Sequence, residues 1–134
     1  MKRFLIFALM CSLLGSCGGP KTTSVADSKA RVVGRTMTHD DGSVSFDWSG
    51  VYVDIRFRGS YLAIELSDTK RNYLNVWIDG EEQPKLTSEG EHTTLVLFND
   101  PSAEGEHLIR IQKATEAEQG RITLHNLTTD GRLL

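Results

Sequence analysis

The sequence is poor in cysteine. Of 134 residues only Cys11 and Cys17 are cysteines, and both lie within the first seventeen positions. Secretory cleavage would remove Cys11 and lipid would occupy Cys17, so the mature domain would carry neither a disulfide nor a free thiol. A disulfide framework, a thiol nucleophile and a thiolate metal site are therefore excluded.

Basic stripes and hydrolase motifs are also absent. The net charge is −3 with no cluster of Lys or Arg, so nucleic acid is not an expected partner. Neither Gly-Asp-Ser nor Gly-x-Ser-x-Gly occurs; Asp41-Gly42-Ser43 has the letters in another order, in an expected hairpin turn. The histidines show no HExxH or paired spacing, so zinc is not expected, and His107 is assigned a hydrogen-bonding role at a strand start. No cofactor is expected.

The longest apolar stretch, Phe4–Leu14, has eleven residues and follows the basic pair Lys2-Arg3. Eleven residues are too few for a bilayer span, which needs about 20, but fit the apolar region of a secretory signal. Leu14-Gly15-Ser16-Cys17 resembles a bacterial lipobox. We expect a lipoprotein signal peptide over residues 1–16, lipidation of Cys17 and anchoring in the bacterial cell envelope; the alternative is ordinary cleavage. Residues 17–30, rich in Gly, Ser, Thr and Lys, are predicted to be a flexible tether.

Residues 31–134 alternate between apolar and polar positions with turn residues between them, a pattern typical of strands. Asp79-Gly80 is a type I′ hairpin signal. At most one helical turn is expected, over 114–119, and no βαβ alternation is present. The prediction is an all-β, jelly-roll-like antiparallel β-sandwich of about eight strands. The expected strands are Val32–Thr38, Ser43–Phe46, Val51–Phe57, Tyr61–Ser67, Leu74–Ile78, Thr93–Phe98, His107–Gln112 and Arg121–Leu127.

Candidate binding residues follow from the same alternation. If Leu74 and Val76 face the core, then Tyr73, Asn75 and Trp77 share the opposite face. That face either stacks on sugar rings, lies beneath another strand or loop, or contacts another domain.

Trp48 precedes the turn pair Ser49-Gly50 and is expected to plug one end of the sandwich, with a sugar platform as the alternative. Arg56 and Arg58 share a wet strand face with Asp54, where cross-strand ion pairing is expected.

Oxygen-bearing side chains of Asp68, Asn72 and Asp79 are of the kind that calcium prefers, but loop carboxylates are usually solvated turn-formers, and a calcium site needs six or more converging oxygens. No metal site is therefore predicted.

Several segments carry a resemblance to a known family. They are Phe46–Tyr52, Asn72–Gly80, Gly105–Arg110, Lys113–Glu116 and Gly120-Arg121. They resemble the N-terminal β-sandwich module of family 2 carbohydrate esterases, acetyl esterases of plant polysaccharides. The resemblance implies that serine-type esterase chemistry belongs to a second, GDS (SGNH)-type hydrolase domain, and that this chain ends where that domain would begin. Ala114 stands where the family more often has arginine, which puts docking of such a domain in question.

The resemblance implies a non-catalytic accessory module that supports and orients a hydrolase domain absent from this chain. The partners would be that domain, a plant-type polysaccharide and, through the lipid anchor, the membrane. Two alternatives remain: a free-standing carbohydrate-binding envelope lipoprotein, and a structural envelope protein whose exposed face meets another protein.

Overall fold

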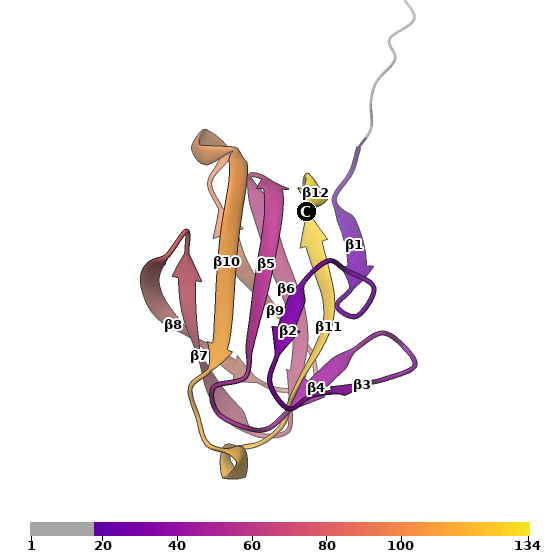
Figure 1. The fold of residues 1–134 in the computed structure, drawn as a ribbon, viewed down its shortest axis with the longest axis vertical. Helices are drawn as coiled ribbons and strands as arrows, with labels where there is room; N and C mark the ends of the chain where they lie inside the picture. The colour runs from indigo at the N-terminus through magenta and orange to yellow at the C-terminus, as the bar shows by residue number, and fades with distance from the viewer. Residues whose placement is uncertain (1–17) are drawn as a thin grey trace, which may run out of the picture.

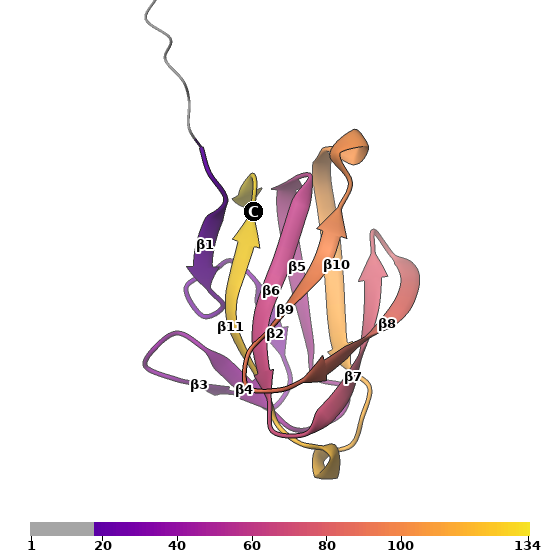
Figure 2. The same cartoon turned by 180° about the vertical axis from the view of Figure 1, so that it is seen from behind.

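The computed structural model describes residues 18–134, so the predicted signal peptide and Cys17 lie outside the described residues. Figures 1 and 2 show the described chain from front and back as strands joined by short loops, with two single 3₁₀ turns. The elements are β1 (Lys21–Ser24), β2 (Arg31–Val33), β3 (Met37–Thr38), β4 (Val44–Phe46), β5 (Tyr52–Gly59), β6 (Tyr61–Asp68), β7 (Arg71–Ile78), β8 (Glu81–Glu89), β9 (Thr93–Asn99), η1 (Pro101–Ala103), β10 (Gly105–Lys113), η2 (Ala117–Gln119), β11 (Ile122–Thr129) and β12 (Arg132–Leu133).

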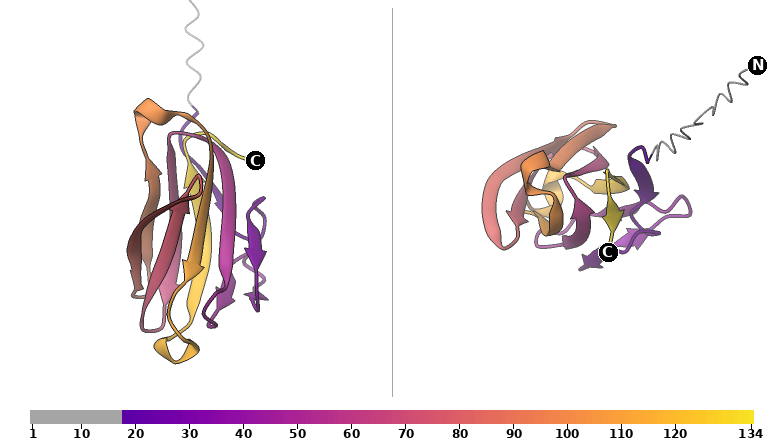
Figure 3. Two further views of the ribbon diagram at one scale, coloured as in Figure 1. Left: turned by 60° about the vertical axis from the view of Figure 1, so that its left-hand side comes forward. Right: turned by 90° about the horizontal axis from the view of Figure 1, so that it is seen from above.

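The strands form two antiparallel sheets packed face to face, as Figure 3 shows from the side. One sheet, here the back sheet, has the order β3-β4-β11-β6-β9, and β1 also pairs with β11. The other, the front sheet, has the order β12-β5-β10-β7-β8, and β2 also pairs with β5. Short strands share an edge: β4 pairs with the first half of β11 and β1 with its second half. The predicted antiparallel two-sheet sandwich is confirmed, but residues 18–134 form twelve strands where about eight were expected.

The core lies between the sheets and is built from the inward residues of each strand. In β5 the positions alternate strictly, with Val53, Ile55 and Phe57 buried. Burial of each such side chain contributes about 1.5–3 kcal/mol relative to exposure. Within residues 18–134 no buried side-chain nitrogen or oxygen lacks a hydrogen-bond partner. The described part thus closes one core of its own and has what a domain needs to fold independently.

Strand β8 was not predicted, although the turn before it was. Asp79 (φ 51°) and Gly80 (φ 85°) both have the positive φ of a type I′ turn, so the predicted hairpin is confirmed. The strand that follows is rich in charge and contains Pro84, features that depress β propensity. They are tolerated because β8 is the edge of the front sheet, where charge and proline also hinder pairing with another chain.

The predicted strand 32–38 is two strands that belong to different sheets. β2 pairs with β5 in the front sheet, whereas β3 pairs with β4 in the back sheet. The crossing occurs at Gly34, whose φ of 126° suits glycine and whose added Cβ would lie 2.8 Å from Val51 Cγ2. Alternation alone could not reveal this change of sheet.

Part of the predicted tether belongs to the sandwich in this structure. β1 pairs with β11 over Lys21–Ser24, and Val25 is only 1% exposed. The Val25 backbone N–H donates to the carbonyl of His125 at 3.0 Å. Its Gly/Ser/Thr composition indicated flexibility, but edge pairing and one buried valine order the segment.

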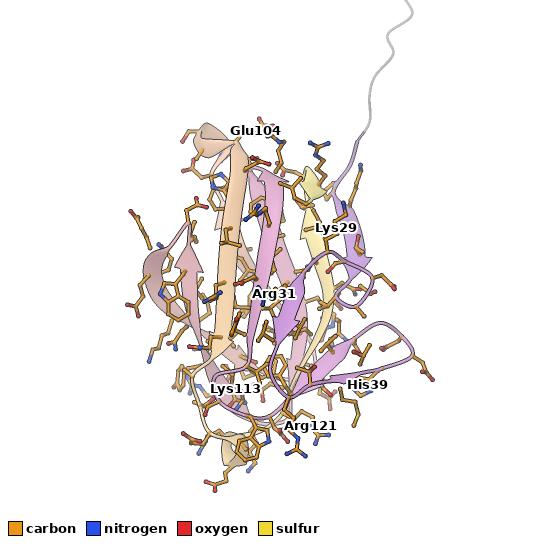
Figure 4. All side chains as sticks on the ribbon, in the orientation of Figure 1. Lys29, Arg31, His39, Glu104, Lys113 and Arg121 are labelled. Carbon is orange, nitrogen blue, oxygen red and sulfur yellow. The ribbon has the colours of Figure 1, made fainter. Side chains whose placement is uncertain are left out.

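A polar cluster closes the lower end of the core, which Figure 4 marks by Lys113. Lys113 is 1% exposed, and its Nζ donates to the carbonyls of Thr115 (2.8 Å) and Glu116 (2.9 Å). Burial lowers the pKa of Lys113, while the charges of Asp68, Asp47 and Glu116 oppose that shift.

The same cluster contains two residues considered above as calcium ligands. Both carboxylate oxygens of Asp68 accept from Asn72 Nδ2 at 2.9 Å, and Ser88 Oγ donates to Asp68 Oδ2 at 2.6 Å. The hydroxyl of Thr115 donates to the side-chain oxygen of Asn72. The loop after β10 is thus closed mainly by the carbonyls that Thr115 and Glu116 offer to Lys113.

Replacing Lys113 with Met should lower the free energy of unfolding by about 2–4 kcal/mol. Methionine preserves most of the buried apolar volume but leaves two carbonyls without their donor, and a buried unsatisfied group costs about 1–3 kcal/mol. Urea denaturation followed by tryptophan fluorescence measures the change. Lys85→Met is the control, because Lys85 is exposed on β8 and should change stability by less than about 0.5 kcal/mol. Equal urea midpoints for the two variants would contradict the role given to Lys113.

Candidate functional site

The outer face of the front sheet carries aromatic, amide and charged side chains. It faces the viewer in Figure 1, with β10 and β5 at its centre. In β7, Leu74 and Val76 are buried, and Tyr73, Asn75 and Trp77 point the other way, as the alternation predicts. Tyr73 is 39% exposed and the other two are half-buried. No described strand covers this face, so burial beneath another strand is excluded for these three side chains.

Strand pairing aligns side chains from neighbouring strands into rows. Trp77 on β7 lies opposite Arg110 on β10, and Arg110 lies opposite Asp54 on β5. In the next row Asn75 lies opposite Gln112. Arg31 on β2, labelled in Figure 4, lies opposite Asp54 in the strand register, on the side of β5 away from β10.

A groove of about 500 Å³ runs along β10 on this face. Its lining residues are Trp77, Gly80, Leu108, Arg110 and Gln112. Of the predicted candidates only Trp77 lines the groove; Asn75 adjoins it through Gln112, and Tyr73 lies farther along β7. We call this feature the β10 groove.

Sequence analysis did not single out three residues of the β10 groove. The strand 107–112 was predicted, but Leu108, Arg110 and Gln112 were not singled out as its outward positions. The alternation of buried Ile109 and Ile111 was the available signal. What could not be read from it was the register that sets Arg110 beside Trp77.

Arg110 is held firmly in the groove wall. Its Nε and Nη2 donate to the two carboxylate oxygens of Asp54 at 2.6 and 2.8 Å, a bidentate pair. Its guanidinium lies 4.1 Å from the ring centroid of Tyr52, a cation–π contact. Hydrogen bonding to Asp54 raises the pKa of Arg110 further. The expected cross-strand ion pairing of this face is thus present: Asp54 pairs with Arg110, and Arg58 Nη2 lies 3.6 Å from a carboxylate oxygen of Glu106 on β10.

The amide side chains beside the groove are weakly engaged. Asn75 Nδ2 donates to Gln112 Oε1 at 3.3 Å, and Gln112 Nε2 lies 3.5 Å from the carbonyl of Gly50. These are long distances for hydrogen bonds. Both amides therefore retain donor and acceptor capacity toward a ligand.

One end of the groove is fixed by the turn at Asp79-Gly80. The side chain of Asp79 accepts from the Leu108 backbone N–H at 2.8 Å and contacts His107 Nδ1 at 2.7 Å. His107 Nε2 lies 2.6 Å from the carbonyl of Ala103, so both ring nitrogens face acceptors. The hydrogen bond with Asp79 raises the pKa of His107; partial burial lowers it, and the contact with Ala103 raises it again. The assigned hydrogen-bonding role of His107 is confirmed.

Trp48 does not plug the end of the sandwich, contrary to the prediction. Its side chain is 52% exposed and borders a separate hollow of about 230 Å³ together with Met37 and Arg121. Phe46 and Val51 are buried in the adjoining core, and the Lys113 cluster closes that end in place of the indole. Trp48 thus lies apart from the β10 groove.

Two serine–histidine contacts lie on the back sheet and its β3–β4 hairpin. His39 Nε2 is 2.8 Å from Ser45 Oγ, and His125 Nε2 is 2.9 Å from Ser67 Oγ. Among residues 18–134 neither histidine has a hydrogen bond to a carboxylate, which orients the base in serine hydrolases. Asp41 instead accepts from the backbone and hydroxyl of Ser43 within the hairpin.

Neither a metal centre nor a membrane helix is found within the described range. Residues 18–134 contain no group of three or more His, Cys, Asp or Glu side chains placed to hold a metal ion. Over the same residues, no helix has the length and apolarity required to cross a bilayer.

The fold and this face define a two-sheet β-sandwich module with an uncovered polar and aromatic sheet surface. Residues 32–134 match the family described as "Carbohydrate esterase 2 N-terminal". The chain belongs to this family, as the resemblance implied.

Longer proteins contain a similar module. The chain is 32% identical over 111 residues to an acetylxylan esterase / glucomannan deacetylase of Cellvibrio japonicus, which covers 82% of this chain and 31% of that protein. It superimposes on a family two carbohydrate esterase from Cellvibrio japonicus with a TM-score of 0.78 and 31% identity, covering 87% of this chain and 35% of that one. The chain thus spans about a third of the length of these relatives.

Two further structures extend the comparison. A family two carbohydrate esterase from Clostridium thermocellum, solved in complex with cellohexaose, matches with a TM-score of 0.74 and 25% identity over 78% of this chain and 32% of that one. A carbohydrate-binding module, CBM36, solved with calcium and xylotriose, matches at 14% identity with a TM-score of 0.59 and covers 80% of this chain and 97% of that one. The second likeness shows the shared fold alone.

Stability should depend on pH through His107. The folded state raises the pKa of His107 above the ordinary value of about 6.5. The stabilisation that protonated His107 contributes is therefore full below about pH 6.5 and is lost as pH rises through the folded-state pKa. The unfolding free energy of the wild type should therefore exceed that of His107→Gln by about 1–3 kcal/mol at pH 6, the range for hydrogen bonds to charged groups, and by less at pH 9.

Urea denaturation at a series of pH values measures this difference. His92→Gln is the matched control, because the His92 side chain is 67% exposed. A gap between wild type and His107→Gln that stays constant or widens as pH rises would contradict the assignment.

Proposed function

We propose that this chain is the accessory module of an acetyl-polysaccharide esterase, in which it supports and orients a serine-type hydrolase domain. The observation that carries the proposal is the coverage of the relatives: four fifths or more of this chain corresponds to about a third of each Cellvibrio japonicus protein. The remaining two thirds have room for a separate catalytic domain. Ester cleavage would belong to that domain, and this module would hold it in place.

Both ends of the described chain lie at the same end of the sandwich, the upper end in Figures 1 and 3. Gly18 and Gly19 border one hollow together with Asp130 and Arg132. The Leu134 backbone N–H donates to the Arg56 carbonyl at 2.9 Å, which fixes the exit beside β5. A domain joined after Leu134 would therefore begin close to the point where the anchoring segment enters.

The activities and ligands of the relatives indicate the substrate class. One is an acetylxylan esterase / glucomannan deacetylase, and another was solved with cellohexaose. The assembled esterase would accordingly act on acetylated plant polysaccharides. The charge of this chain agrees: without Lys2 and Arg3 it carries 13 basic and 18 acidic groups, which suits neutral glycans better than polyanions.

The amino-terminal segment would place this module in the bacterial cell envelope, anchored by lipid on Cys17. The supporting observation is the order of basic pair, apolar stretch of eleven residues and lipobox-like Leu14–Cys17. Acyl chains contribute about 0.8 kcal/mol per buried methylene, so a multiply acylated terminus would anchor stably.

Cys17→Ser should abolish lipid attachment. In bacteria fed radiolabelled palmitate, the wild-type chain should become labelled and partition into detergent, whereas the variant should do neither. Cys11→Ser, which alters the segment to be removed, is the control and should retain the label. Labelling of Cys17→Ser at the wild-type level would exclude Cys17 as the site of lipid attachment.

A domain exchange tests the accessory role. Residues 18–134 would replace the matching N-terminal part of the Cellvibrio japonicus acetylxylan esterase. The chimera should unfold at a higher temperature than the isolated hydrolase part and deacetylate acetylxylan at least about tenfold faster, since each 1.4 kcal/mol of lost positioning costs tenfold in rate.

The control chimera carries the CBM36 module, which shares the fold at only 14% identity. If both chimeras behave like the isolated hydrolase part, the chain does not support that domain. Acetyl-ester hydrolysis by residues 18–134 alone, with a serine labelled by a covalent inhibitor, would also overturn the proposal, because the module would then be catalytic itself.

A further inference from the structure

We propose that the β10 groove is itself a binding site for a neutral oligosaccharide chain, separate from any site on a hydrolase domain. The inference goes beyond the accessory role, because it assigns ligand contact to this module's own residues. It rests on the side chains that line the groove, on their free hydrogen-bonding groups and on the charge of the groove.

Planar and apolar groups line the groove on a rigid support. The Trp77 indole is half-buried and Leu108 is 36% exposed, with the Arg110 guanidinium completing the surface. Two contacts restrain Arg110: the bidentate pair with Asp54 and the Tyr52 ring. All these residues stand on paired strands, so little conformational entropy would be lost on binding.

Hydrogen-bonding capacity lies where a sugar would need it. The Arg110 guanidinium has five N–H donors. Its Nε and Nη2 each donate one hydrogen bond to Asp54, and the remaining N–H groups can donate to a ligand. Gln112 and Asn75 make only long contacts of 3.3 and 3.5 Å. Amides both donate and accept, as sugar hydroxyls do, and an apolar platform with a few convergent polar groups is typical of small-molecule sites.

Charge separates a neutral glycan from an anionic ligand. Arg110 is the one charged residue that lines the groove among those described, and Asp54 already neutralises it at hydrogen-bond distance. Glu82 lies opposite Trp77 on β8 and adds negative charge at the rim. A carboxylate or phosphate ligand would have to compete with Asp54, whereas a neutral hydroxylated chain would not.

Size separates a glycan from a protein partner. The strip from Leu108 to Gln112 covers five residues, about 13 Å of strand from first to last, and only Leu108 and Trp77 supply large apolar side chains in the groove. A stable protein interface buries about 800 Å² on each partner. The groove suits a few sugar rings better than a protein surface.

Isothermal titration calorimetry of residues 18–134 tests the site with cellohexaose, xylohexaose and mannohexaose as probes. At least one should bind, and Trp77→Ala should weaken its association about tenfold or more, equivalent to 1.4 kcal/mol. Gln112→Ala should weaken it several-fold, and Trp77→Phe should retain part of the affinity. Trp48→Ala is the matched control, an exposed tryptophan outside the groove, and should leave affinity within about twofold.

Thermal unfolding of every variant confirms that each is folded at the titration temperature. No heat with any of the three neutral probes at millimolar concentration would overturn the proposal. Equal losses for Trp48→Ala and Trp77→Ala would overturn it as well, and so would binding confined to an anionic probe, hexagalacturonate. Because the titration uses no hydrolase domain, its failure leaves the domain-exchange result untouched.

Discussion

Burial of the inner faces of two antiparallel sheets is the constraint on which the rest of the structure depends. Because side chains alternate along a strand, a residue that enters the core assigns its neighbours to the outside. Ile109 and Ile111 are buried, so Leu108, Arg110 and Gln112 must face solvent. The β10 groove is thus the outer surface of the elements that form the core. Changes that shift the register of β10 would destroy both together.

Polar side chains hold the loops and turns at the two ends of the sandwich, beyond the apolar core. At the lower end the Lys113 ammonium saturates two loop carbonyls, and Asp68 collects donors from Asn72 and Ser88. Toward the other end, His107 joins the Asp79-Gly80 turn to the carbonyl of Ala103. The two contacts differ in kind: the Lys113 ammonium is buried, whereas the His107 imidazole has its pKa raised by the hydrogen bond with Asp79. The second also fixes one end of the groove.

Sequence reasoning succeeded where alternation was strong and uninterrupted. β5, β6 and β7 were anticipated, as were the type I′ turn and the shared face of Tyr73, Asn75 and Trp77. It failed where local composition opposed the tertiary setting: charged, proline-containing β8 is a strand because it pairs with β7, and the supposed tether is ordered by β11. Trp48 was expected to plug one end of the sandwich, but its side chain is 52% exposed.

Periodicity and turn chemistry by themselves determined the all-β class, most strands and the face on which each side chain lies, because these properties are local. Only the tertiary structure decided which strands are neighbours. Gly34 sends β2 and β3 to different sheets, and pairing sets Arg110 between Asp54 and Trp77. The contacts of Arg110 with Trp77 and Asp54 join residues more than thirty positions apart in the chain. Their formation depends on how both sheets pack at once, which no short window of sequence contains.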